Sequence, residues 1–159
     1  MTRRLLQRHT LILISALLVI LDQLSKSWAR DHLEATLTGR LVPGLLQLRL
    51  VQNTGAAFSL FSGATPILGV LSFAFALGLC VWIWRSSPLP FWQGLGAAFL
   101  LGGALGNGLD RWRLGHVTDF IQLVPIDFPV FNAADVAINL AVLCFGIDLL
   151  TRRHDQQQS

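Results

Sequence analysis

The stretch Gly102–Asp135, GGALGNGLDRWRLGHVTDFIQLVPIDFPVFNAAD, holds four of the nine acidic residues of a chain that is 53% hydrophobic. It starts at the polar end of one apolar run, residues 91–109, and finishes at the polar start of another, residues 133–150. Asp119 follows the first run, and Asp135 lies on the first turn of the second. Two neighbouring apolar segments therefore deliver two carboxylates, which form a candidate reaction centre.

The composition around this stretch indicates a membrane protein. The 159 residues predict one domain, and a mean hydropathy of +0.57 with only 13% charged residues is too apolar for an ordinary soluble domain. The net charge of +3 does not indicate a nucleic-acid partner, because the basic residues are scattered or flank apolar runs.

Four apolar runs predict a single integral membrane domain that is all-α apart from a small β element. The first run is preceded by arginines, as in a secretory signal peptide, but no small-residue cleavage site follows it, so we interpret it as a retained span. The four predicted transmembrane helices cover approximately residues 10–28, 66–84, 91–109 and 133–150.

Basic residues orient these spans. Six of the twelve lie densely at the two termini and in the short turn 85–90, whereas the other six are spread over the opposite face. Short basic flanks stay cytoplasmic, and tryptophans lie near the predicted span ends as expected of interfacial belts. We therefore expect cytoplasmic termini, with residues 29–65 and 110–132 on the extracytoplasmic side.

The first outer segment predicts an extracytoplasmic β-hairpin or small sheet over approximately residues 41–63. Leucines alternate with other residues along Leu45–Gln52, and Asn53-Thr-Gly supplies turn residues before a possible return along Ala56–Phe61. We also expect a short surface helix over residues 29–40.

Small residues recur at every fourth position of the third run, at Gly94, Ala98, Gly102 and Gly106. Such a stripe allows another helix to approach closely. Asn107, Asp110 and Arg111 extend the stripe with polar side chains that packing alone does not explain. A plain interfacial ion pair between Asp110 and Arg111 is the alternative.

The fourth run places Asn132, Asp135 and Asn139 within about 60° on one helical face, which is unsuited to lipid. Asn132 is a natural helix N-cap, and a carboxylate at Asp135 suits the helix dipole, so structural roles compete with a functional one. Asp22 and Lys26 form an i, i+4 pair in the first run, where support of the outer loops is the expected role.

Two carboxylates that are close together and partly dehydrated do not both ionise easily, which provides an acid and a base at one pH. Such a pair can activate water against a peptide carbonyl and protonate the leaving amine. Pro125 and Pro129 favour a compact return that would bring Asp119 and Asp135 together.

Two other site chemistries are weaker. A metal site around His116 would have one histidine and carboxylates without a recognised ligand motif, and no serine lies in a nucleophile-elbow context. We expect neither a metal nor a cofactor.

Several motifs together resemble those of the lipoprotein signal peptidase (signal peptidase II) family. They are Leu21-Asp-Gln-Leu-Ser-Lys26, Asn53-Thr-Gly-Ala-Ala-Phe-Ser59, Gly102-Gly-Ala-Leu-Gly-Asn107, Asp110-Arg111, Gly115-His-Val-Thr-Asp-Phe120 and Phe131-Asn-Ala-Ala-Asp135. Their order and spacing match, and the resemblance covers most of the chain.

The resemblance implies an aspartic endopeptidase of the bacterial inner membrane that cuts diacylglyceryl-modified prolipoproteins before the lipidated cysteine. Asp119 and Asp135 stand at the family's catalytic positions. Asn107, Arg111 and Asn132 stand in its active-site surround, Asn53 in its extracytoplasmic β element, and Asp22 and Lys26 in its first-span motif. The expected partners are the lipid bilayer and the prolipoprotein, and we expect a monomer.

Two other function classes are possible from the residues alone. A small ion or proton transporter would also carry intramembrane carboxylates, but the chain has no visible repeat and its acids cluster at one face. A non-enzymatic scaffold would not need polar positions on facing spans.

Overall fold

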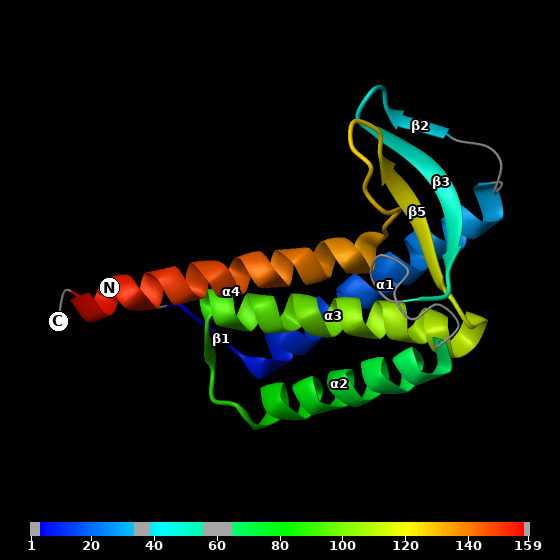
Figure 1. The fold of residues 1–159 in the computed structure, drawn as a ribbon. Coiled ribbons are helices and arrows are strands. Elements are labelled where there is room, and N and C mark those ends of the chain that lie inside the picture. Colours follow the sequence, from blue (N-terminus) through cyan, green and yellow to red (C-terminus); the bar gives the residue numbers. More distant parts are fainter. Residues whose placement is uncertain (1–3, 34–38, 56–64, 158–159) are drawn as a thin grey trace.

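The computed structural model describes residues 4–33, 39–55 and 65–157, which form a helical bundle with a small sheet at one end (Figure 1). Four helices occur in these residues: α1 (Arg8–His32), α2 (Thr65–Arg85), α3 (Phe91–Leu114) and α4 (Ala133–Gln157). The strands are β1 (Leu5–Leu6), β2 (Gly39–Val42), β3 (Leu46–Asn53), β4 (Leu89–Pro90) and β5 (Val117–Leu123). The predicted mostly helical fold with a small β element is therefore confirmed.

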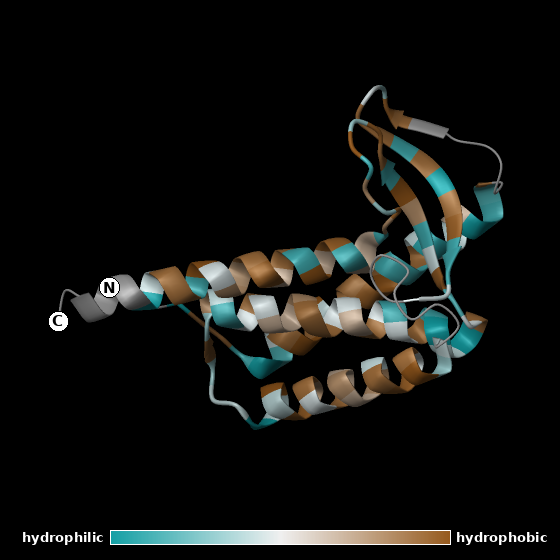
Figure 2. Ribbon diagram, viewed as in Figure 1, coloured by the Kyte–Doolittle hydropathy of each residue, from teal (hydrophilic) through white to brown (hydrophobic). Residues whose placement is uncertain are grey.

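Each predicted span coincides with one of the helices. Three of the helices, α1, α2 and α4 as far as Arg152, are long and apolar enough to cross a membrane. The third helix, α3, is not among them, because glycines and polar residues lower its hydropathy. Figure 2 shows hydrophilic residues on the parts of α1, α3 and α4 next to the sheet, and others on the strands and at the opposite end of the bundle, whereas α2 is mostly hydrophobic.

The helix α3 occupies the centre of the bundle and packs against α1, α2 and α4 (Figure 1). Its glycines allow this close packing. A Cβ atom on Gly103 would lie 2.7 Å from the carbonyl oxygen of Ala134, and one on Gly106 would lie 2.6 Å from Oδ2 of Asp22. Gly103 lies outside the predicted small-residue stripe, but the close helix approach predicted from that stripe is confirmed at Gly106 and at Gly102, whose Cβ would lie 2.8 Å from Cβ of Leu18.

The sheet at the end of the bundle has the antiparallel strand order β2-β3-β5. Its central strand β3 matches the predicted strand, but β5, which carries Asp119, was not predicted. In the register between them, Val51 lies opposite Asp119 and Asn53 opposite Val117. The possible return strand along Ala56–Phe61 falls outside the described residues.

The predicted surface helix over residues 29–40 is wrong in its described part. Residues 29–32 form the last turn of α1, and Gly39 already begins β2. Residues 34–38 lie outside the described part. The helix α1 simply continues, since nothing in residues 29–32 breaks it.

The first and last described parts of the chain, β1 and the end of α4, lie at the bundle end opposite the three-stranded sheet (Figure 1). The strands β1 and β4 pair there, with Leu5 opposite Pro90 and Leu6 opposite Leu89. This short ladder joins the N-terminus to the α2–α3 connection.

Replacement of Gly103 by alanine tests the α3–α4 packing. Because the new Cβ would meet backbone, the two helices must separate, and we expect a loss of about 1–3 kcal/mol in the free energy of unfolding. Thermal unfolding in detergent measures the effect. Gly78→Ala is the matched control, since its Cβ meets nothing within 4 Å, and its melting temperature should not fall. Equal destabilisation by both variants would contradict the packing role of Gly103.

Candidate active site

Asp119 lies on β5, where its side chain is buried and both carboxylate oxygens accept hydrogen bonds. Nδ2 of Asn53 donates to Oδ2 at 3.0 Å, and Nδ2 of Asn132 donates to Oδ1 at 2.6 Å. Burial raises the pKa of Asp119 to about 6, and the nearby Asp135 carboxylate also raises it. The two asparagine donors and the Lys26 charge oppose this increase without cancelling it.

Asp135 lies on the first turn of α4, where it forms a reciprocal capping arrangement with Asn132. The backbone N–H of Asp135 donates to Oδ1 of Asn132 at 3.0 Å, and the backbone N–H of Asn132 donates to Oδ2 of Asp135 at 3.0 Å. The other carboxylate oxygen, Oδ1, accepts from Nδ2 of Asn107 at 2.8 Å. Asp135 therefore takes part in the cap of α4 and also contacts the polar side chains of the candidate site.

Asn132 links the two carboxylates. It is fully buried, and its Nδ2 lies 2.6 Å from Oδ1 of Asp119 and 3.1 Å from Oδ1 of Asn107. The same side chain caps α4 through its oxygen. One amide therefore joins β5, α3 and the start of α4, which places Asp119 beside the helix that carries Asp135.

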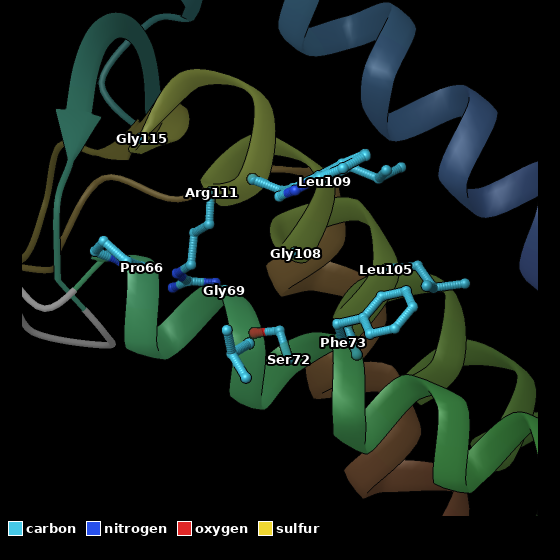
Figure 3. Close-up of a pocket in the computed structure, with 12 residues that line it drawn as sticks. Pro66, Gly69, Ser72, Phe73, Leu105, Gly108, Leu109, Arg111 and Gly115 are labelled. Atoms are coloured by element: carbon cyan, nitrogen blue, oxygen red, sulfur yellow. The ribbon is translucent and has the colours of Figure 1, made fainter.

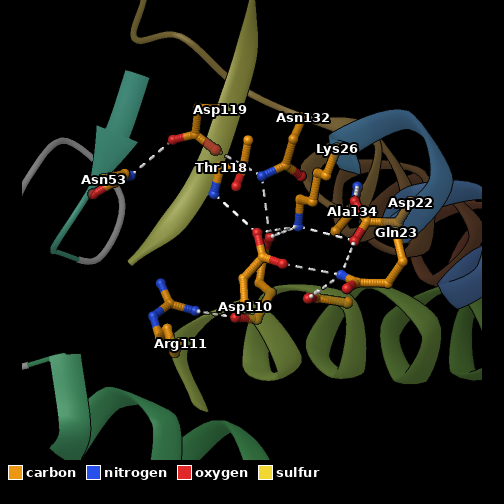
Figure 4. A network of polar contacts seen from close by, with 12 residues as sticks. Asp22, Gln23, Lys26, Asn53, Asp110, Arg111, Thr118, Asp119, Asn132 and Ala134 are labelled. Atoms are coloured by element: carbon orange, nitrogen blue, oxygen red, sulfur yellow. Dashed lines mark hydrogen bonds and ion pairs between the residues drawn. The ribbon is translucent and has the colours of Figure 1, made fainter. Parts of the chain in front are cut away.

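A buried ionic cluster lies directly beneath these amides (Figure 4). Nζ of Lys26 is 2.9 Å from Oδ2 of Asp22, 3.5 Å from Oδ2 of Asp110 and 2.8 Å from Oδ1 of Asn107. Oδ1 of Asp22 accepts the backbone N–H of Ala134 at 2.9 Å, so α1 also caps α4. The direct contacts of Asp22 and Lys26 are therefore with α3 and with the start of α4, and not with the outer loops that they were predicted to support.

The alternative of an Asp110–Arg111 ion pair does not describe the structure. The carboxylate of Asp110 contacts Lys26 and accepts the backbone N–H of Thr118 at 2.9 Å. The guanidinium of Arg111 donates instead to the carbonyl oxygens of Asn107, at 3.5 Å, and Gly55, at 3.2 Å. These residues diverge because they are adjacent on a helix and point to different neighbours.

Asn139 is a predicted site residue that takes no part in the described network of polar side chains. Its Nδ2 donates to the carbonyl oxygen of Asp135, one turn back along α4, at 2.9 Å, and the residue is exposed. It lines the same groove as Asp135 but has no described contact with the other polar side chains.

Three polar residues of the network were not predicted: Gln23, Thr118 and Arg30. Nε2 of Gln23 donates to Asp22, to Asp110 and to the Gly106 carbonyl oxygen, each at 3.1 Å. Thr118 is buried, and its hydroxyl accepts from Nη1 of Arg30 at 3.0 Å. Gln23 lies beside Asp22 in the first run, which was the available signal, whereas nothing local distinguishes Thr118.

Asp119 and Asp135 both line a groove of about 900 Å³ that opens between α2 and α4. Asn53, Asn107 and Arg111 contribute its polar part, and apolar residues of the helices and of the segment before α4 form the remainder. Within the described part of the chain, His116 is not among the residues that line this groove.

A second groove of about 720 Å³ lies between α2 and α3 (Figure 3). Its walls are mainly apolar, with Val70, Phe73 and Leu105 among them, and Arg111 reaches it as well as the first groove. Arg111, Ser72 and Ala104 line both grooves.

The arrangement is suited to acid–base chemistry. Four carboxylate oxygens accept N–H donors from a common set of asparagines, in a partly buried groove. Such donors allow one carboxylate to stay ionised beside another that retains a proton.

Comparison with known proteins identifies the family. The family model described as signal peptidase (SPase) II matches residues 14–151. The lipoprotein signal peptidase of Parasynechococcus marenigrum (strain WH8102) is 55% identical over 153 residues, which are 96% of each chain. That of Synechococcus sp. (strain RCC307) is 51% identical over 148 residues, covering 92% of this chain and 98% of the relative.

A solved structure described as a bacterial membrane enzyme, at 2.3 Å resolution, has the same fold. It superposes with a TM-score of 0.88 at 26% identity and covers 100% of this chain and 98% of its own. The sequence match over nearly the whole length and the shared fold agree with the earlier resemblance. The chain therefore belongs to the signal peptidase II family of membrane proteases.

Proposed function

We propose that this protein is an aspartic endopeptidase that removes the signal peptide from diacylglyceryl-modified prolipoproteins by cleavage before the lipidated cysteine. Asp119 and Asp135 form its catalytic dyad. The observation that carries the proposal is their presence in one groove, with Asn132 bonded to both residues. The names of the relatives support the substrate class.

In this mechanism one aspartate of the dyad is ionised and the other is protonated. The ionised carboxylate removes a proton from water as the water attacks the scissile carbonyl, and the acid then protonates the departing amine. The raised pKa of Asp119, about 6, suits a residue that holds a proton close to neutral pH. The dyad shares its proton, so either aspartate can act as the acid.

We further propose that all four helices cross the inner membrane, with cytoplasmic termini and the sheet outside. The third helix, α3, has 24 residues and a length of about 36 Å, which suffices for a crossing. Its lower hydropathy is acceptable because it packs among the other three helices rather than facing lipid. The basic residues near the termini favour this orientation.

The groove between α2 and α4 provides a lateral entrance for a substrate that resides in the bilayer. Its apolar walls include Leu71 and Phe75 of α2 and Leu143 of α4. A signal peptide's apolar segment and two acyl chains favour such surroundings, at about 0.8 kcal/mol per buried methylene group.

Asp119→Asn and Asp135→Asn test the dyad. Each change removes a proton carrier but keeps the side-chain shape, so each should lower turnover of a lipidated precursor at least about 100-fold while the protein stays folded. Signal-peptide release on a gel and thermal unfolding provide the two measurements. Asp127→Asn, on the exposed turn that follows β5, is the control and should cleave normally. Near-normal turnover by either dyad variant would contradict the assignment.

The pH dependence tests the role of Asn53. Its donated hydrogen bond favours the ionised form of Asp119 and so holds that pKa down, which means that Asn53→Ala should raise it further. We expect the limb of the pH–rate profile near pH 6 to move upward by about one pH unit.

Gln47→Ala is the control for this measurement. It removes the Gln47–Gln122 hydrogen bond, at 2.8 Å, from the same β3–β5 pair but leaves Asp119 untouched. An unchanged profile for Asn53→Ala, or the same displacement in both variants, would refute the electrostatic role of Asn53.

Lipid recognition is tested with one precursor in two forms, with and without the diacylglyceryl group. Loss of the acyl chains removes apolar burial, so the unlipidated form should be cleaved at least about tenfold more slowly at limiting concentration. The ratio of the two initial rates is the measurement. Equal rates would leave a peptidase without lipid selectivity.

A further inference from the structure

Three asparagine amides surround the two carboxylates, and each presents its NH2 group to a carboxylate. Asn53 and Asn132 donate to Asp119, and Asn107 donates to Asp135. An amide turned by 180° would instead present an oxygen, which would repel an ionised carboxylate. The orientation of each amide is therefore essential to the charge of the site.

The oxygen of each amide accepts from a group that orients it. The backbone N–H of Gly55 donates to Oδ1 of Asn53 at 2.9 Å, and the backbone N–H of Asp135 donates to Oδ1 of Asn132 at 3.0 Å. The corresponding donor to Asn107 is Nζ of Lys26, at 2.8 Å. An ammonium group has only donors, so it allows one orientation of the amide.

The donors to Asn53 and Asn132 are backbone N–H groups close to them in the sequence, whereas Lys26 is a side chain of another helix, 81 positions away from Asn107. Asn132 also donates to Oδ1 of Asn107, at the longer distance of 3.1 Å, but its Nδ2 lies closer to Asp119. Lys26 is completely buried between Asp22 of α1 and Asp110 of α3. A buried ion pair contributes little net stability, so stability alone explains this lysine poorly.

We infer that Lys26 is a positioning residue for the reaction, which acts on Asp135 by holding the Asn107 amide with its NH2 group toward that carboxylate. The inference rests on the proposed dyad. Lys26 has no described contact with either catalytic carboxylate, so its effect on chemistry passes through Asn107 and through its positive charge.

Other charged groups also lie around Lys26 and Asp135, so a variant of Lys26 has to keep the net charge of this cluster constant. Asp22 and Asp110 contact Lys26 directly, while Arg111 of α3 and Asp119 of β5 lie around Asp135. Removal of Lys26 alone would leave two neighbouring buried carboxylates without their cation and could unfold the protein. The double variant Lys26→Met/Asp22→Asn keeps the net charge of the cluster.

The experiment measures kcat, KM and the pH–rate profile of this double variant with lipidated precursor in detergent. We expect a folded protein whose kcat is about 10- to 100-fold lower, with KM nearly unchanged, because a carboxylate that is displaced from its working position reacts more slowly. The profile should move to higher pH, because a carboxylate without its oriented donor binds its proton more tightly. Wild-type kcat and profile would overturn the inference and leave Lys26 a purely neutralising residue.

The control removes another i, i+4 ion pair, at the opposite end of the bundle. Nε of Arg152 lies 2.7 Å from Oδ2 of Asp148, and Arg152→Met/Asp148→Asn should leave kcat and the profile unchanged. If Lys26→Met/Asp22→Asn fails to accumulate, Lys26→Gln/Asp22→Asn retains a polar group beside Asn107. Its amide can rotate, so the same displacement of the profile is expected, and an unchanged profile would overturn the inference.

A coupling measurement tests the path through Asn107. In an Asn107→Ser background the orienting effect is already lost, so adding Lys26→Met/Asp22→Asn should lower kcat less than about twofold. If the fold-loss in kcat caused by Lys26→Met/Asp22→Asn is the same with and without Asn107→Ser, Lys26 acts by another route than Asn107. Retained turnover in Asp119→Asn and Asp135→Asn would refute the proposed dyad itself, whereas their loss with unaffected lysine variants would refute only the present inference.

Discussion

The structure depends on the hydrogen bonds of one buried amide, that of Asn132. Its oxygen caps α4, and its NH2 group binds the carboxylate of Asp119 on the sheet. No other described side chain connects the start of α4 directly to β5 in this way. A buried amide that lacks its partners costs about 1–3 kcal/mol. The hydrogen bond to Asp119 and the cap of α4 therefore both stabilise the buried position of Asn132. The bundle and the sheet are thereby brought into one site.

The close approach of the helices makes this link possible. The glycines of α3 let Asp22 of α1 and Ala134 of α4 come near the same helix turn, as the short Cβ distances at Gly103 and Gly106 demonstrate. Polar side chains on α1, α3 and α4 then fall within hydrogen-bonding reach across the bundle. Packing of small residues and burial of polar ones are therefore two aspects of one arrangement.

The sequence was sufficient for features that depend on local pattern. Apolar runs predicted the helices, and the position of Asn132 before Asp135 predicted the α4 cap, because periodicity and capping are read over a few residues. The strand β5 was missed because Val117–Phe120 are all buried, so no alternation of polar and apolar residues marks it. The Asn53–Asp119 contact joins residues that are 66 positions apart in the sequence, and Lys26 is separated from Asn107 by 81 positions. Only the fold reveals such contacts. The catalytic roles of these residues stay predictions.

The spacing of Asp22 and Lys26 has a consequence for how the chain is made. Synthesis proceeds from the N-terminus, so α1 is complete long before α3 and α4 exist. At that stage Asn107 and Ala134, the later partners of this pair, have not been translated. Because the lysine and the aspartate lie one turn apart on the same helix, at 2.9 Å, each already has a counter-ion. Residues 10–28 contain no other charged side chain, so this part of α1 can enter a lipid phase as an electrically neutral segment, with polar groups prepared for helices that arrive later.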